Sequence, residues 1–181
     1  MSERPARTSR GAPDRDGGAD AAAPPMRAFS RSLPMQLLRA REAVMQRFRP
    51  MLHGHGVTEQ QWRVIRALVD GGAAEIGALA DQCCILPASL SRIVDTLEAK
   101  RLVARRAHAA DQRRVVVEIT GAGRKLFQSV APHSEAHYRE IAALVGAERL
   151  DAFYAMLDDL IARLEAKERR ATRSVGPRTA V

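Results

Sequence analysis

The chain has 181 residues and a formal net charge of +8, and 28% of its residues are charged; this length suits one compact domain with extensions. No apolar run approaches the roughly 18 residues of a membrane-spanning helix, and the N-terminus lacks the apolar core of a secretory signal. The two cysteines are adjacent, which excludes a disulfide framework, so we expect a cytoplasmic protein without membrane association.

The two ends of the chain differ in composition from its middle. Residues 1–31 are rich in Ala, Arg, Gly and Pro and have no apolar period, so we expect a disordered N-terminal tail. Residues 169–181 form a basic C-terminal tail by the same criteria. Between them, residues 32–168 follow a helical period almost throughout, which predicts one mainly α-helical domain.

Four helices are predicted in the first part of this domain. The first begins at Ser32-Leu33-Pro34, where proline tolerates the first turn of a helix, and covers about residues 33–54. Thr58-Glu59-Gln60-Gln61 has the form of a capping box and begins the second, which ends at Gly71-Gly72. Two short helices follow over residues 75–83 and 87–100, each with one apolar stripe at i, i+3, i+4 and i+7.

The period changes after residue 101. Residues 102–106 and 115–119 alternate and are rich in β-branched side chains, which predicts a small β-hairpin around the polar stretch 108–114. Long helical patterns then cover residues 122–145 and about 147–168. The last one has a 3-4-3-4 apolar seam that is typical of packing on a partner helix: Leu150, Phe153, Leu157, Leu160 and Leu164.

Two short, tightly joined helices followed by a basic hairpin are the order of a winged helix-turn-helix, whose second helix enters the major groove of duplex DNA. Residues 87–125 contain nine Lys/Arg against four Asp/Glu, which suits a surface facing phosphates. We expect an Arg at the wing tip to enter the minor groove, oriented by a neighbouring Asp. An amphipathic helix and a solvated turn are the alternative interpretation. The predicted DNA-binding residues are Pro87, Ser89, Ser91, Arg92, Thr96, Arg106, Asp111, Gln112 and Arg113.

The sequence of the predicted hairpin also resembles the signature of a known protein family. The sequence Asp111-Gln112-Arg113-Arg114-Val115-Val116-Val117-Glu118-Ile119-Thr120-Gly121-Ala122-Gly123 resembles the wing signature of the MarR family, D-x-R-x-x-x-V-x-L-T-x-x-G, with Ile119 in place of Leu. Residues 76–80 and 89–98 resemble the helix-turn-helix of that family. Residues 32–35, 38–42, 58–64 and 83–87 are similar to the branch that regulates homoprotocatechuate degradation.

The resemblance implies a homodimer that binds a pseudo-palindromic operator in double-stranded DNA. Helices over about 33–54 and 122–168 would interlock in the dimer, and the DNA-binding lobe would cover about 58–120. The resemblance further implies repression of nearby genes, relieved by a small aromatic acid. Hydroxylated phenylacetates and hydroxylated pyridine carboxylates both suit such a sensor.

An aromatic carboxylate needs a flat apolar wall and a guanidinium that can pair with both of its oxygens. The family places its ligands between the dimerisation helices and the DNA-binding lobe. Trp62 lies near several arginines in that region, and the ligand-binding residues that we predict are Ser32, Met35, Arg39, Trp62 and Arg63. The alternative is that Trp62 belongs to the core and that the arginines form surface ion pairs.

Single motifs in the sequence also admit other functions. Cys83-Cys84 admits a thiol-based redox sensor, but Cys83 lies on a buried stripe, where burial raises a thiol pKa, so a packing role is favoured. His133 and His137 have a zinc-compatible spacing without further ligands, so no metal or other cofactor is expected. The sequence contains no catalytic triad or phosphate loop, which argues against an enzyme. A less specific, nucleoid-type DNA-binding protein stays open, because the basic tails suit it as well.

Overall fold

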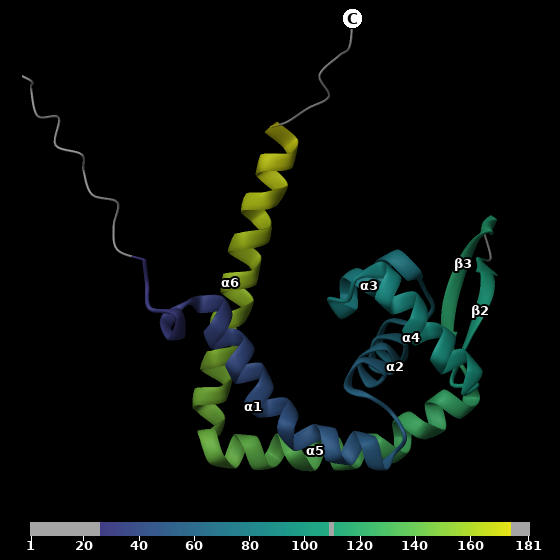
Figure 1. The fold of residues 1–181 in the computed structure, drawn as a ribbon, viewed down its shortest axis with the longest axis horizontal. Coiled ribbons are helices and arrows are strands. Elements are labelled where there is room, and N and C mark those ends of the chain that lie inside the picture. The colour runs from purple at the N-terminus through teal and green to yellow at the C-terminus, as the bar shows by residue number, and fades with distance from the viewer. Residues whose placement is uncertain (1–25, 109–110, 175–181) are drawn as a thin grey trace, which may run out of the picture. The chain divides into compact units, whose positions relative to one another are not determined.

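The computed structural model describes the backbone of residues 26–108 and 111–174. These residues belong to two units that divide between Leu38 and Arg39, within the first long helix. In chain order the elements are the 3-10 helix η1 (Phe29–Arg31), α1 (Leu33–Gly54), α2 (Glu59–Gly71), β1 (Ala74–Glu75), α3 (Ile76–Cys83), α4 (Pro87–Ala99), β2 (Val103–His108), β3 (Asp111–Ile119), α5 (Gly121–Val145) and α6 (Ala147–Ser174) (Figure 1). The predicted mainly helical fold with a small hairpin is therefore confirmed.

The sheet has one strand more than the sequence predicted. Its order is β1-β3-β2, and both pairings are antiparallel. The additional strand β1 has two residues, Ala74 and Glu75, which is too short to produce a visible alternation. Strand β3 also begins earlier than predicted, because the pairing of the hairpin continues to His108 and Asp111. The predicted polar turn over residues 108–114 is therefore largely β-strand.

The described part of the N-terminal unit contains η1 and the first turns of α1. The backbone amide of Gln36 donates to the Ser32 carbonyl at 3.0 Å, and its side-chain amide donates to the Ser30 carbonyl. Phe29 and Leu38 are 75% and 51% exposed, so the described part of this unit has no core of its own.

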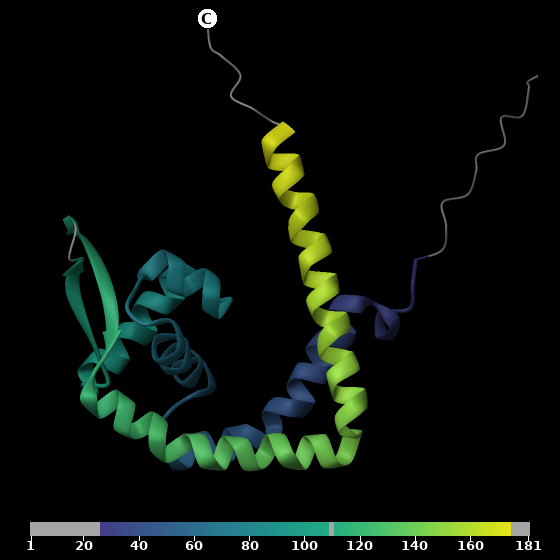
Figure 2. The ribbon, with the colours of Figure 1, turned by 180° about the vertical axis from the view of Figure 1, so that it is seen from behind.

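The core of the larger unit forms around α2. A capping box at Thr58 and Gln61 begins this helix as predicted, with Gln61 N donating to Thr58 Oγ1 at 3.2 Å. Seen from either side, α2, α3 and α4 lie together beside the hairpin (Figures 1 and 2). Apolar side chains from these helices, the sheet and α5 are fully buried: Val64, Ile65, Leu68, Leu79, Leu90, Val94, Leu97, Val117 and Val130. None of the helices in residues 26–108 and 111–174 has the length and apolarity to cross a membrane.

Both helices of the helix-turn-helix end in a Schellman motif without glycine. At the end of α3, Ile85 N donates to Ala80 O and Cys84 N donates to Asp81 O, with Cys84 in the left-handed conformation at φ 49°. At the end of α4, Leu102 N donates to Leu97 O, and Arg101 has φ 58°. Glycine usually occupies this position, because it has no Cβ to strain. These motifs set the direction in which the chain leaves α3 toward α4, and α4 toward β2.

The start of α5 packs closely against the hairpin. The Thr120 hydroxyl accepts a hydrogen bond from Gly123 N at 3.0 Å and donates to the Leu102 carbonyl at 3.0 Å. A Cβ atom at Gly123 would overlap this carbonyl oxygen and the Ile119 side chain. The glycine of the wing signature is thus required by close packing and not by its φ angle.

We expect Gly123→Ala to destabilise the protein by about 1–3 kcal/mol, the usual range for overpacking a core. Urea denaturation followed by circular dichroism measures the loss as a lower midpoint. Gly121→Ala is the matched control, because nothing lies within 4 Å of the added Cβ on the same helix. Equal midpoints for the two variants would contradict this explanation.

Candidate DNA interface and effector pocket

Helix α4 presents a polar face that its own buried stripe holds outward. Pro87 occupies the first turn of the helix, after Leu86 as the N-cap. Leu90, Val94 and Leu97 are 0% exposed and fix the inner face. On the outside, the predicted contact residues Pro87, Ser89, Arg92 and Thr96 are exposed and Ser91 is half-buried.

The side chains on this outer face differ in how far they are engaged. The Thr96 hydroxyl donates to the Arg92 carbonyl at 2.9 Å, which leaves it free to accept but not to donate. No carboxylate among the described side chains pairs with the Arg92 guanidinium. Arg92 is exposed, so its donors are available to a phosphate or to a base edge.

The wing is fastened to α4 by Arg105. One nitrogen of its guanidinium donates to Asp95 Oδ1 at 2.6 Å, a second pairs with Glu98, and the Arg105 backbone amide donates to Glu98 Oε1 at 3.1 Å. Hydrogen bonding to Asp95, with a further contribution from Glu98, raises the pKa of Arg105. This bridging role of Arg105 could not be predicted, because no local pattern in the sequence links Arg105 to Asp95 and Glu98.

The predicted wing contacts are described only in part. Arg106 is exposed and forms an ion pair with Glu118 on the neighbouring strand. Asp111, Gln112 and Arg113 form the start of β3. Their side chains, and the predicted pairing of Asp111 with Arg113, lie outside the described residues.

A cavity opens beside α2 between aromatic and basic side chains. Trp62 is 7% exposed and stacks on Phe127, with ring centroids 5.5 Å apart and planes at 19°. The hydroxyl of Tyr138, on α5, accepts a hydrogen bond from the Arg66 guanidinium at 3.2 Å. The residues that line the cavity come from α1, α2 and α5: Arg41, Val44, Met45, Phe48, Glu59, Trp62, Arg63, Arg66 and Tyr138.

This lining includes part of the predicted ligand site. Trp62 and Arg63 both contribute to it, whereas Arg39 is exposed and is not among the lining residues. Ser32 and Met35 belong to the N-terminal unit. The other seven lining residues were not predicted, and Arg66 and Tyr138 are two of them. Arg66 is one helical turn after Trp62 and was detectable from that spacing, but Tyr138 is far away in the sequence and gave no signal.

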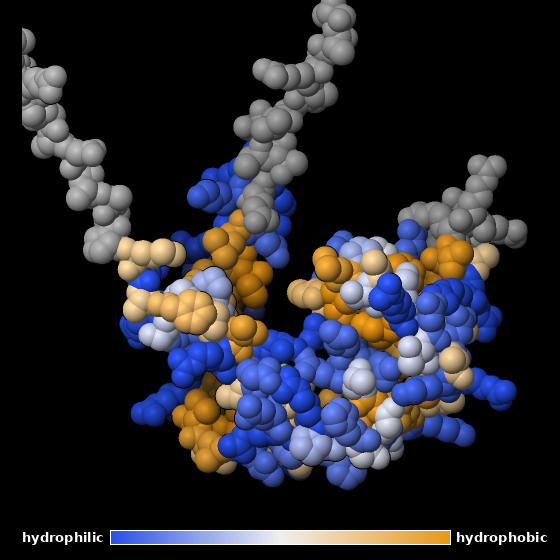
Figure 3. Space-filling view, viewed as in Figure 1, coloured by the Kyte–Doolittle hydropathy of each residue, from blue (hydrophilic) through white to orange (hydrophobic). Residues whose placement is uncertain are grey.

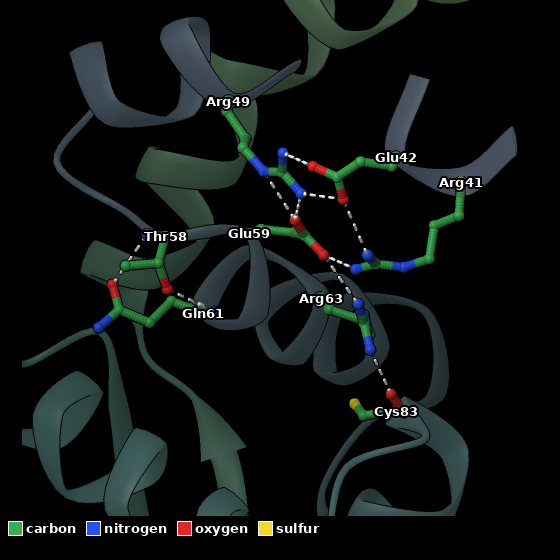
Figure 4. A network of polar contacts seen from close by, with 8 residues as sticks. All are labelled: Arg41, Glu42, Arg49, Thr58, Glu59, Gln61, Arg63 and Cys83. Atoms are coloured by element: carbon green, nitrogen blue, oxygen red, sulfur yellow. Dashed lines mark hydrogen bonds and ion pairs between the residues drawn. The ribbon is translucent and has the colours of Figure 1, made fainter. Parts of the chain in front are cut away.

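A polar network on one side of this cavity centres on Glu59 (Figure 4). The Glu59 side chain is 15% exposed. Its Oε2 accepts hydrogen bonds from Arg49 at 3.0 and 3.1 Å, and its Oε1 pairs with Arg63 at 3.2 Å and with Arg41. Arg49 also forks onto Glu42, and this hydrogen bonding lowers the pKa of Glu42. Arg63 reaches farther, since its other terminal nitrogen donates to the Cys83 carbonyl at 2.9 Å.

Comparison with known proteins identifies the family. A family model described as the MarR family matches residues 55–114, from the end of α1 into the wing. The transcriptional regulator FarR of Neisseria gonorrhoeae is 39% identical over 133 residues, which are 74% of this chain and 88% of FarR. The chain belongs to the MarR family. This MarR-family protein is thus a DNA-binding transcriptional regulator, as the wing signature predicted, and the family is not one of enzymes.

Two further relatives bear on the branch within the family. The homoprotocatechuate degradative operon repressor of Escherichia coli is 37% identical over 131 residues, 72% of this chain and 88% of the repressor. The crystal structure of NadR in complex with 4-hydroxyphenylacetate is similar with a TM-score of 0.65 at 38% identity, over 77% of this chain and 96% of NadR. The predicted resemblance to the homoprotocatechuate branch is therefore confirmed.

The structure distinguishes the two cysteines. Cys83 is 1% exposed, and burial raises the pKa of its thiol more than the nearby Arg63 lowers it. Cys84 is exposed. The relatives named above lend no support to a redox sensor. Within the described residues no group of three or more His, Cys, Asp and Glu side chains could hold a metal ion.

We expect iodoacetamide at neutral pH to alkylate Cys84 in the folded MarR-family protein and to leave Cys83 unmodified. A thiol must ionise to react, and burial keeps Cys83 in its protonated form and out of reach. Mass spectrometry after timed quenching measures both rates, with urea-unfolded protein as the reference in which both cysteines react. Equally fast modification of Cys83 in the folded protein would favour the redox interpretation again.

Proposed function

We propose that this protein is a homodimeric repressor of an aromatic-compound catabolic operon, and that a small aromatic carboxylic acid releases it from its operator. The observation that carries the proposal is the cavity beside α2, which combines the rings of Trp62 and Tyr138 with three guanidiniums. The E. coli repressor of homoprotocatechuate degradation and the 4-hydroxyphenylacetate complex of NadR support the same chemistry. As a DNA-binding regulator it acts in the cytoplasm.

The outer face of α4 and the wing form the proposed DNA interface. Ser89, Arg92 and Thr96 face the base edges of the major groove, while Pro87 and Ser91 lie at the tip of the helix, close to the DNA backbone. Arg92 can fork onto the O6 and N7 atoms of guanine. Arg106, Asp111, Gln112 and Arg113 then follow the adjacent minor groove, where narrow geometry increases the negative potential.

A second copy of the chain is the proposed partner of α6. No described side chain of this helix is buried, and apolar surface follows it (Figure 3). Tyr154, Met156, Ile161 and Leu164 are between 48% and 63% exposed. A long helix with such an apolar face buries it against another helix. Two-fold symmetry would place two half-sites about one helical turn apart in a pseudo-palindromic operator.

The effector fits the cavity by complementary chemistry. Its ring lies against Trp62 and Tyr138, and its carboxylate pairs with the guanidiniums of Arg63 and Arg66. Three arginines and one glutamate line the cavity, so an anion is attracted to it. Ser32, Met35 and Arg39 stay predicted contacts for this ligand.

Operator binding is tested by fluorescence anisotropy, with the chain's own upstream promoter duplex against a scrambled duplex at near-physiological salt. We expect Arg92→Ala to weaken promoter binding by about 1–3 kcal/mol and to relax specificity at one base pair. Arg92→Lys is the matched control, because it retains the charge but not the fork. A lysine variant with full specificity would mean that Arg92 contacts only phosphate. Equal wild-type affinity for both duplexes would favour the nucleoid-type protein.

Effector binding has a built-in reporter, because Trp62 is the chain's only tryptophan. We expect 4-hydroxyphenylacetate or 6-hydroxynicotinate to change the Trp62 emission saturably and to raise the Kd for the promoter duplex. Arg66→Lys should bind the acid about tenfold or more weakly, since a bidentate charge-assisted pair is lost. Arg139→Lys, an exposed position on α5 outside the cavity, is the control. An unchanged Kd for the acid in Arg66→Lys would contradict this site.

A further inference from the structure

Arg63 is the side chain that joins the cavity to the helix-turn-helix. It lies on α2 one turn after Glu59, and both residues line the cavity. One terminal nitrogen donates to Glu59 Oε1 at 3.2 Å, and the other donates to the backbone carbonyl of Cys83 at 2.9 Å (Figure 4). The same planar guanidinium thus contacts an anion beside the cavity and the last residue of α3.

The Cys83 carbonyl is a position where a hydrogen bond matters. The last carbonyls of an α-helix have no partner within the helix, and Cys83 is 1% exposed, so water replaces the arginine poorly. A cation at a helix C-terminus is also favoured by the helix dipole. Directly after Cys83 come the left-handed Cys84, the N-cap Leu86 and then α4. Arg63 therefore supports the turn before α4, which is the recognition helix of the proposed DNA interface.

We propose that Arg63 is the positioning residue that couples effector binding to operator release, an inference that rests on the proposed function. In the effector-free protein, one terminal nitrogen of the Arg63 guanidinium donates to Glu59, and the other donates to the Cys83 carbonyl. An effector carboxylate in the cavity replaces Glu59 as the anion paired with Arg63. The guanidinium shifts toward the ligand, the Cys83 carbonyl loses its donor, and α4 loses the support of its turn.

The geometry makes an anion specifically effective. Glu59 is shared by Arg41, Arg49 and Arg63, so it can release one of them and still have two partners. A neutral aromatic compound of the same shape can occupy the apolar wall, but it offers no charge to compete with Glu59. The carboxylate, not the ring, therefore transmits the signal.

The test measures coupling in full-length wild type, Arg63→Met and Arg49→Met. Coupling is the ratio of the promoter Kd at saturating 4-hydroxyphenylacetate to the Kd without it, so it does not depend on how tightly a variant binds the acid. Arg49→Met is the matched control, since Arg49 contacts the same Glu59 but neither lines the cavity nor contacts Cys83. Thermal melting by circular dichroism verifies that each variant is folded, and Arg63→Lys replaces Arg63→Met if the latter is not.

We expect coupling of about tenfold or more in wild type and Arg49→Met, within the usual range for allosteric proteins, and below about twofold in the Arg63 variant. Trp62 emission should give the same factor for the effect of the promoter on acid binding, because coupling between two binding sites is reciprocal. A loss of fold alone would lower both affinities without abolishing their ratio.

Two results would overturn the inference alone: wild-type coupling in a folded Arg63 variant that binds the acid, or release of the wild-type protein by 4-hydroxyphenylacetamide, which lacks the charge. Failure of the wild-type protein to respond to 4-hydroxyphenylacetate, by Trp62 emission or by promoter Kd, would instead overturn the effector part of the proposed function and this inference with it. The wild-type measurement therefore separates the two.

Discussion

The carboxylate of Glu59 is the interaction on which the arrangement around the cavity depends. It lies in the first turn of α2, where the helix dipole favours a negative charge, and it is mostly withdrawn from water. Guanidiniums from α1 and from α2 itself converge on it. Without this anion, Arg41, Arg49 and Arg63 would have only the more exposed Glu42 to offset their mutual repulsion. Glu59 thus permits α1 to approach α2 and leaves the cavity with an excess of positive charge.

The two faces of α2 have different surroundings. Toward α3, α4 and the sheet, its side chains are fully buried and close-packed, so a movement of α2 on that face is passed on to the core. Toward α1 and α5, its side chains and their neighbours surround a cavity that is lined by aromatic rings, by the half-buried Arg63 and by the more exposed Arg41 and Arg66. Close packing resists small distortions, whereas a charged network has alternative pairings that differ little in free energy. In the proposed mechanism, a ligand therefore acts on α2 through the polar face, and the apolar face carries the effect to the DNA-binding elements.

The sequence was informative where a residue's neighbours are close in the chain. The stripe of Leu90, Val94 and Leu97, the capping box at Thr58 and the basic hairpin follow from local periodicity and spacing, and they were sufficient to predict a winged helix-turn-helix. The Schellman motifs at Cys84 and Arg101 were not predicted, because these positions lack the glycine that normally marks such a motif. Strand β1 was not predicted either, since two residues are too few to show an alternation of apolar and polar side chains.

The pocket was harder to predict because its members meet only through tertiary packing. Trp62 and Arg63 were identified from the chemistry that an aromatic acid requires, but the same reasoning could not distinguish Arg39 from Arg41, which differ only in the face of α1 that they occupy. Tyr138 enters the cavity because α5 returns past α2, a contact that no local pattern encodes. The bond from Arg63 to Cys83 is of the same kind, and its acceptor is a backbone carbonyl, which every residue possesses. Residue type alone can therefore indicate that an arginine binds an anion, whereas its link to the recognition helix is a property of the fold.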